Sequence, residues 1–223
     1  MIRLDMSEYQ GAGSVDRLLD KGEGNTNSLL IQIRQQPFSV VLLDEIEKSS
    51  PEVLNLLLQM LDEGQLTDSD GHAASFKSAI IIATSNAGSA EITAKVSAGE
   101  NLESFERPLI DKLISEGRFK PELINRFDEI VLFRPLNFEE TSQVAQLMLD
   151  SVNKQLASQN ISVKLTADAL EKVVKAGYDP QFGARPMRRV IQRMVEDAVA
   201  KRVLSGQAVV GTEITLSAQD LAE

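Results

Sequence analysis

The sequence contains no cysteine, which excludes disulfide bonds, catalytic thiolates and sulfur-ligated metal sites. It contains a single histidine, His72, so a metal site built from several histidines is excluded as well. Tryptophan is absent and aromatic residues make up 4% of the chain, so a core must be built mainly from Leu, Ile, Val and Ala. Hydrophobic residues account for 43% of the 223 residues, which is enough for one or two domains.

No apolar run approaches the ~18 residues of a membrane span, and no basic segment leads into an apolar one at the N-terminus. The formal net charge is -10, from 23 Lys and Arg against 33 Asp and Glu. An acidic chain binds nucleic acid poorly, because phosphate contacts need clustered Lys and Arg. The one basic cluster lies between Arg185 and Arg202. We therefore expect a cytoplasmic protein whose partners are neither membranes nor nucleic acid.

The first part of the chain alternates between strand and helix signals. Residues 39–43 form a continuous apolar run, which predicts a strand covered on both faces in a parallel sheet. Ser50 followed by Pro51 predicts the start of a helix, and Asp70-Gly71 predicts a hairpin turn. A second buried strand is expected over residues 79–83. This alternation is typical of an α/β domain.

The character of the chain changes near Pro135. Residues 129–133 predict a further strand, which Pro135 ends. The pattern then becomes mainly helical, so we expect a first domain over residues 1–135 and a second over residues 136–223. In the second domain the pattern predicts helices over 138–159, 166–175 and 184–204, and short strands over 161–165 and 213–216.

Acidic residues follow the first apolar strand directly. The run ends in Asp44 and Glu45, at the sheet edge where open α/β folds bind their ligands. Phosphoryl transfer needs one carboxylate near a metal ion and another group that activates water. Asp44 suits the first role and Glu45 suits the second, as a general base. Taken alone, however, an acidic strand end is common in α/β proteins and has no ligand in most of them.

The next strand ends in Asn86. If the two strands are neighbours, Asn86 lies beside Glu45 and can hold the same water molecule. An asparagine at a strand end more often satisfies its own backbone in a turn. Two adjacent strands that end in these groups favour a site over a coincidence.

Several segments closely resemble the second ATPase domain of Clp-type AAA+ unfoldases and disaggregases, of the ClpA, ClpB and ClpC kind. The resemblance covers nearly the whole chain, and its motifs occur in the family's order. They are Ile-Arg-Leu-Asp-Met-Ser-Glu-Tyr (residues 2–9), Leu-Asp-Glu-Ile-Glu-Lys (43–48), Leu-Leu-Gln-Met-Leu-Asp-Glu-Gly-Gln-Leu-Thr-Asp (57–68), Thr-Ser-Asn-Ala-Gly-Ser (84–89), Phe-Lys-Pro-Glu-Leu-Ile-Asn-Arg-Phe-Asp-Glu-Ile-Val (119–131) and Gly-Tyr-Asp-Pro-Gln-Phe-Gly-Ala-Arg-Pro-Met-Arg-Arg (177–189).

The resemblance implies a fold, two cofactors and five site residues. The fold is an α/β AAA+ P-loop NTPase core, three-layered with a mainly parallel sheet, followed by a small α+β C-terminal lid domain. The cofactors are ATP and Mg²⁺. Asp44 and Glu45 match the Walker B pair, with Asp44 on the metal and Glu45 catalytic, and Asn86 matches sensor 1. Arg126 matches the arginine finger that reaches a neighbouring subunit's nucleotide, and Arg185 matches sensor 2. Without the family, both arginines would be interpreted as surface charges.

The sequence departs from this family in three places. It contains no G-x-x-x-x-G-K-[ST] motif and no Gly-Lys pair. In the family this loop precedes the segment that begins here at Ile2, so we expect a truncation that removes the P-loop strand and helix and leaves no measurable ATPase activity. Residues 20–30 lack the aromatic of the family's substrate-gripping loop. The absence of the tripeptide that docks a peptidase ring favours a stand-alone chaperone over a protease subunit.

Three functional hypotheses remain. In the first, the chain is part of an ATP-dependent unfoldase or disaggregase, a homo-hexamer that acts on unfolded or aggregated proteins. The second is a nucleotide-incompetent module kept for hexamer assembly or regulation. The third, a DNA-acting AAA+ ATPase, is disfavoured by residues 177–186 and by the acidic charge. Loss of the central strand and its helix also predicts exposed apolar surface.

Overall fold

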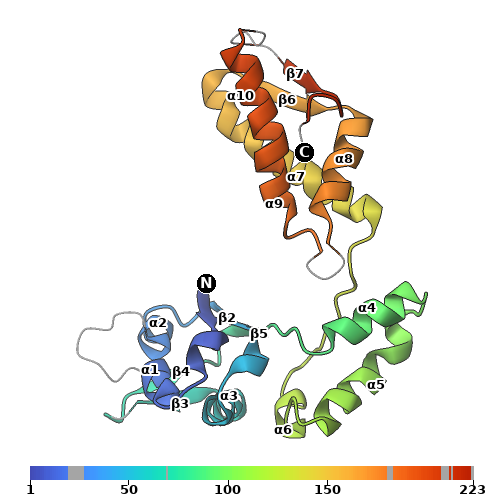
Figure 1. Cartoon of the computed structure of the whole chain (residues 1–223). Coiled ribbons are helices and arrows are strands. Elements are labelled where there is room, and N and C mark those ends of the chain that lie inside the picture. The colour runs from blue at the N-terminus through green and yellow to red at the C-terminus, as the bar shows by residue number, and fades with distance from the viewer. Residues whose placement is uncertain (20–27, 69, 180–182, 207–210, 212, 222–223) are drawn as a thin grey trace. The chain divides into compact units, whose positions relative to one another are not determined.

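The computed structural model describes residues 1–19, 28–68, 70–179, 183–206, 211 and 213–221. The chain divides into two compact units, Met1–Phe133 and Arg134–Glu223, each of which has its own core (Figure 1). The segment over residues 20–30, which lacks the aromatic of the family's substrate-gripping loop, lies outside the described residues except for residues 28–30.

The first unit is built on a sheet of three parallel strands in the order β1 (Ile2–Asp5), β2 (Val40–Asp44) and β5 (Ile80–Ala83). The register pairs Asp5 with Asp44 and Leu43 with Ala83, so the three strands end at the same edge. The α/β class that the sequence predicts is therefore confirmed.

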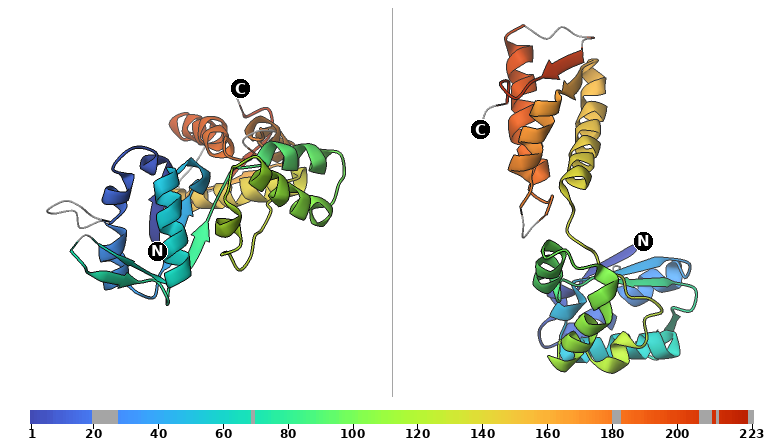
Figure 2. Two further views of the ribbon diagram at one scale, coloured as in Figure 1. Left: turned by 90° about the horizontal axis from the view of Figure 1, so that it is seen from below. Right: turned by 90° about the vertical axis from the view of Figure 1, so that its right-hand side faces the viewer.

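One face of this sheet is covered by α1 (Ser14–Leu19), α2 (Leu29–Gln35) and α3 (Pro51–Glu63) (Figure 2). The helices begin where the sequence favours a cap: the Ser28 and Ser50 side chains accept hydrogen bonds from the amides of Ile31 and Val53. α3 ends at Gly64, which adopts a left-handed conformation. The buried side chains on this face come from the sheet and from all three helices: Ile2, Leu4, Val41, Leu43, Leu18, Leu29, Leu30, Ile33, Val53, Leu57 and Met60.

The opposite face of the sheet is open. Val40 and Leu42 are half-buried, while Ile80 and Ile82, their ladder partners, are 63% and 44% exposed. The prediction that residues 39–43 are covered on both faces is therefore wrong, because α1, α2 and α3 bury only the face of Val41 and Leu43 and leave Val40 and Leu42 half-buried. The predicted exposure of apolar surface is confirmed.

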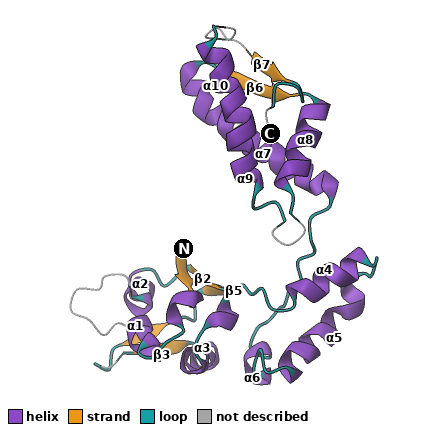
Figure 3. Ribbon diagram, in the orientation of Figure 1, coloured by secondary structure: helices purple, strands orange, loops and turns teal. Residues whose placement is uncertain are grey.

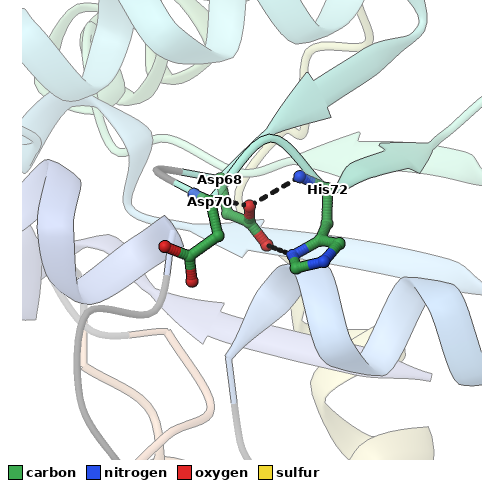
Figure 4. A group of neighbouring side chains, drawn as sticks. All are labelled: Asp68, Asp70 and His72. Atoms are coloured by element: carbon green, nitrogen blue, oxygen red, sulfur yellow. Dashed lines mark hydrogen bonds and ion pairs between the residues drawn. The ribbon is translucent and has the colours of Figure 1, made fainter.

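The predicted hairpin is also confirmed, with antiparallel strands β3 (Gln65–Thr67) and β4 (Ala73–Ser75). Figure 4 shows how its turn is held, with Asp68 accepting hydrogen bonds from the backbone amides of Asp70 and His72 (Figure 4). The Arg34 guanidinium pairs with the same carboxylate at 2.8 Å. Partial burial acts to raise the pKa of Asp68, but these hydrogen bonds lower it overall. The two backbone amides whose hydrogen bonds Asp68 accepts belong to its own turn, so its role in holding the hairpin is explained without a metal ion.

The rest of the first unit contains α4 (Ser89–Ser97), α5 (Leu102–Ser115) and α6 (Pro121–Ile124). Ile92, Phe105 and Leu109 form a small core between α4 and α5. Residues 129–133 are a loop, so the strand predicted there is wrong (Figure 3). A strand is stable only when its backbone pairs with a neighbour, and no described strand pairs with these residues; Phe133 is 84% exposed.

The second unit packs helices against a two-stranded parallel sheet (Figure 2). A capping box of Asn137 and Glu140 begins its first helix. Gly177 allows a close approach, because a Cβ there would lie 2.4 Å from the Met187 sulfur and 3.0 Å from its Cα. Among the described residues, no helix is long and apolar enough to cross a bilayer. The elements are α7 (Phe138–Leu156), β6 (Ser162–Leu165), α8 (Ala167–Gly177), α9 (Met187–Val190), the π-helical η4 (Ile191–Glu196), α10 (Asp197–Leu204) and β7 (Glu213–Leu216).

Asp220 ties the end of the second unit to α10, and this contact predicts an acid-sensitive stability. The Ser217 amide, the Arg202 guanidinium and the Ser217 hydroxyl hydrogen-bond to the Asp220 carboxylate and lower its pKa from 3.8 to about 2. Because the folded-state pKa is depressed, the stabilisation is present above pH 3.8 and is lost as the pH falls from 3.8 toward 2. After allowance for solvent screening, we expect Asp220→Asn to cost about 1–2 kcal/mol at pH 7 and almost nothing at pH 2.

Urea unfolding followed at the amide NMR signals of β7 measures this difference. Asp150→Asn is the matched control, because Asp150 lies on the exposed side of α7 and accepts a hydrogen bond from Gln146. An Asp220→Asn penalty that stays constant between pH 7 and pH 2 would contradict the prediction.

Candidate functional site

The carboxylate of Asp44 lies at the end of β2, beside the end of β5. Its Oδ1 accepts a hydrogen bond from the Thr84 hydroxyl at 2.5 Å, and its Oδ2 pairs with the Arg3 guanidinium at 2.5 Å. The ladder explains both contacts, because Leu42 pairs with Arg3 on one side and with Ile82 on the other. Side chains two residues apart share a face, so Arg3, Asp44 and Thr84 all lie on the open face of the sheet.

Glu45 turns the chain out of the strand in a left-handed conformation, with φ 58° and ψ 50°. This conformation is unfavourable for a residue with a Cβ, and such residues cluster at functional sites. The Glu45 amide donates to the Thr84 hydroxyl at 3.2 Å, and the amide of Ile46 donates to the Thr84 carbonyl at 3.0 Å. Two hydrogen bonds to the end of β5 therefore hold this turn.

The side chain of Asn86 reaches Glu45. Its Nδ2 donates to Glu45 Oε1 at 3.3 Å, and Lys48 Nζ pairs with Glu45 Oε2 at 2.5 Å. The hydrogen bond to Glu45 raises the pKa of Lys48. The structure thus brings together three of the predicted site residues, Asp44, Glu45 and Asn86, at the ends of two neighbouring strands.

The two predicted arginines lie elsewhere. Arg126 follows α6, is 53% exposed, and forms an ion pair with Asp62 near the end of α3. Arg185 is exposed in the turn immediately before α9, in the second unit. Their roles at a nucleotide stay predictions.

Four residues around the carboxylates were not predicted as site residues from the sequence: Arg3, Glu47, Lys48 and Thr84. Glu47 Oε1 accepts a hydrogen bond from the Asn86 amide at 3.1 Å. The positions of Glu47 and Lys48 within the Walker B-like segment were a signal that could have drawn attention to them. Arg3 and Thr84 can be found only once the register of the three strands is known.

The donor atoms around Asp44 suit a hard divalent cation. Carboxylate and hydroxyl oxygens are the ligands that Mg²⁺ prefers, and Mg²⁺ is usually held by one or two carboxylates together with substrate phosphates. Asp44 and Thr84 provide one carboxylate and one hydroxyl from neighbouring strand ends. Both Asp44 oxygens are engaged in the structure, one by the Thr84 hydroxyl and the other by the Arg3 guanidinium. The donor set therefore fits Mg²⁺ on the condition that the ion takes the place of the Arg3 guanidinium.

Comparison with known proteins follows the division into two units. Residues 1–130 match the family model for the AAA domain (Cdc48 subfamily), and residues 136–216 match the model for the C-terminal, D2-small domain of ClpB protein. The chain is 41% identical over 219 residues to the Chaperone protein ClpB of Meiothermus ruber. The aligned residues cover 96% of this chain and 25% of that protein.

Two further relatives are similar to the chain over nearly its whole length. The Chaperone protein ClpB of Bacillus anthracis is 40% identical over 225 residues, 99% of this chain and 26% of that protein. The protein of Bacillus subtilis named Negative regulator of genetic competence ClpC/MecB is 40% identical over 230 residues, 99% of this chain and 28% of that protein. The chain spans about a quarter of the length of these relatives. Both family models match in order along it, and the chain belongs to the Clp-type AAA+ ATPase family.

Proposed function

We propose that this chain forms the catalytic edge and lid of the second ATPase domain of an ATP-driven protein-remodelling machine. The observation that carries the proposal is the hydrogen bond from Asn86 Nδ2 to Glu45 Oε1 at 3.3 Å, beside Asp44. It joins a general-base candidate to a polar amide at neighbouring strand ends, in a family whose relatives include proteins named Chaperone protein ClpB.

Each residue of the cluster has a distinct proposed task. Glu45 accepts the proton of the attacking water, and Asn86 holds the Glu45 carboxylate within reach of that water. Asp44, with Thr84, would hold Mg²⁺, which when bound neutralises charge on the phosphate oxygens. The Lys48 ammonium compensates the charge of Glu45 and fixes its second oxygen.

Arg126 and Arg185 act on the nucleotide as cations in this proposal. A guanidinium stays charged at all relevant pH values and offers forked donors that match phosphate oxygens. Arg126 serves the site of a neighbouring subunit in a homo-hexamer, and it exchanges its ion pair with Asp62 for the phosphate when it does so. Arg185 serves the nucleotide from the lid.

The proposed setting is cytoplasmic, and the proposed substrates are unfolded or aggregated proteins. A peptidase ring as a further partner is disfavoured by the sequence. A second candidate function, a nucleotide-incompetent assembly or regulatory module, is favoured by one observation: residues 20–30 contain no aromatic side chain like that of the family's substrate-gripping loop. An experiment that supplies the P-loop distinguishes the two.

A graft provides this experiment. The 225-residue region of Bacillus anthracis ClpB that matches this chain is replaced by the chain, and the first ATPase domain of the host is silenced by a glutamine at its own general base. We call this protein the ClpB graft. We expect it to hydrolyse ATP with a kcat of at least ~1 s⁻¹, within the usual range of enzymes, and to reactivate a heat-aggregated reporter enzyme. The host with its own segment retained is the matched control. A graft that assembles as a hexamer yet neither binds nor hydrolyses ATP would contradict the proposal and support the second candidate.

A further inference from the structure

Glu47 links the ends of β2 and β5 through its side chain. It lies in η2 (Ile46–Lys48), the single helical turn that follows Glu45. Its Oε1 accepts a hydrogen bond from the backbone amide of Asn86 at 3.1 Å, across 39 residues of sequence. This contact is separate from the one that joins the Asn86 side chain to Glu45.

The contact matters because the sheet no longer holds the chain at Asn86. β5 ends at Ala83, and the next fixed point is Thr84, whose carbonyl and hydroxyl accept the amides of Ile46 and Glu45. Beyond Thr84, the hydrogen bond to Glu47 is the backbone tether that runs from Asn86 to the β2 side of the site. The path of residues 85–86 therefore depends on a side chain.

The geometry that this tether sets is demanding. The hydrogen bond between Asn86 Nδ2 and Glu45 Oε1 is already long at 3.3 Å, so a small backbone shift breaks it. Positional errors of about 1 Å can cost about 10²-fold in rate when they misplace a catalytic group. Loss of the Glu47 contact would thus shift Asn86 and break the hydrogen bond between Asn86 and Glu45.

The second oxygen of Glu47 is also informative. Oε2 is buried and, among the described residues, has no hydrogen-bond partner. A buried acceptor without a donor is destabilising. One oxygen of this carboxylate therefore accepts the hydrogen bond from Asn86, while the other destabilises the fold. This combination is typical of a residue whose role is to position a neighbour and not to stabilise the fold.

We propose that Glu47 is a positioning residue, which fixes the backbone of Asn86 and through it the Asn86–Glu45 contact. The proposal rests on the roles proposed above for Glu45 and Asn86. It predicts that an acceptor atom at the right reach is needed, and that a negative charge is not. Glu47→Gln keeps the acceptor, Glu47→Asp keeps the charge but is one methylene too short, and Glu47→Ala removes both.

The contact itself is tested on the full chain, labelled with ¹⁵N. We expect hydrogen exchange at the Asn86 amide to be at least tenfold faster in Glu47→Ala and Glu47→Asp than in the wild type, and nearly unchanged in Glu47→Gln. Exchange at the amides of β2 is expected to stay the same in all variants. Glu122→Ala, at an exposed glutamate of α6, is the matched control. Unchanged exchange at Asn86 in Glu47→Asp would overturn the proposal.

The consequence is tested in the ClpB graft by steady-state kinetics. Glu47→Ala and Glu47→Asp are expected to lower kcat about 10- to 100-fold with the KM for ATP within about twofold of wild type, and Glu47→Gln is expected to restore kcat. If Glu47 only stabilised the fold, its loss would not lower kcat while leaving the KM for ATP unchanged, and Glu47→Gln would not specifically restore kcat. If Glu45→Gln leaves hydrolysis unchanged, the proposed function fails. If Glu45→Gln abolishes hydrolysis while Glu47→Asp keeps full kcat, the inference about Glu47 fails alone.

Discussion

Glu45→Gln is expected to lower the kcat of the ClpB graft by about 10²- to 10⁴-fold, the contribution of a positioned general base. The substitution is nearly isosteric, and glutamine Oε1 still accepts the hydrogen bond from Asn86 Nδ2. What it removes is the ability to take a proton from water. Binding of a fluorescent ATP analogue is expected to stay within about threefold of wild type, because a loss confined to the chemical step leaves ground-state affinity intact.

Glu63→Gln is the matched control for this experiment. Glu63 is an exposed residue at the end of α3, so its variant carries the same chemical change outside the site. A Glu45→Gln graft that hydrolyses ATP as fast as wild type would rule out Glu45 as the base. An equal loss in both variants would point to a general effect on folding or assembly.

Arg126→Ala is expected to lower kcat in the ClpB graft by about 10³-fold or more, the range found for arginine fingers. The guanidinium is 53% exposed and paired with Asp62, so its removal leaves the core of the first unit intact. We therefore expect unchanged thermal stability and unchanged hexamer assembly, measured by calorimetry and by size-exclusion chromatography with light scattering. Arg118→Ala, at another exposed arginine of the same unit, is the matched control.

Mixing experiments test whether Arg126 acts on a neighbouring subunit. In a one-to-one mixture of Glu45→Gln and Arg126→Ala subunits, a site on an Arg126→Ala subunit can receive an intact arginine from a Glu45→Gln neighbour. Random assembly around a ring with head-to-tail interfaces makes about a quarter of the interfaces complete. ATPase activity near that fraction of wild type is expected, and no recovery on mixing would show that Arg126 acts within its own subunit.

The sequence predicted the local elements of the first unit well, because their signals are local. The Ser50-Pro51 pair marks the start of α3, and Asp70-Gly71 marks the β3–β4 turn, whatever the rest of the chain does. The apolar run before Asp44 likewise predicts β2 by itself. In the second unit the pattern predicted the helices and both short strands, although it could not reveal the π-helical turn of η4.

The errors concern features that depend on distant partners. Residues 129–133 have a strand-like pattern, but a strand requires a neighbouring backbone, which no periodicity can supply. The coverage of β2 on its second face depends in the same way on which elements pack there. An apolar sequence pattern therefore indicates which faces of a segment could be buried, and it does not show which neighbouring elements actually cover them.

The same distinction applies to the site. Asp44, Glu45 and Asn86 were predictable because parallel strands bring their carboxyl ends to one edge. The contact of Thr84 with Asp44 was not predictable, because it depends on the register between β2 and β5. The contact of Glu47 with Asn86 was not predictable either, because it depends on the left-handed turn at Glu45. A conformation unusual for glutamate leaves no mark in the sequence.

The open face of the sheet has a consequence for calorimetry. The heat-capacity increment of unfolding arises mainly from apolar groups that water reaches only after the fold is lost. Ile80 and Ile82 are already hydrated in the native state, and Val40 and Leu42 are partly so. The first unit therefore has a smaller heat-capacity increment of unfolding than its length implies. Its free energy of unfolding changes less steeply with temperature, both above and below the temperature of maximum stability.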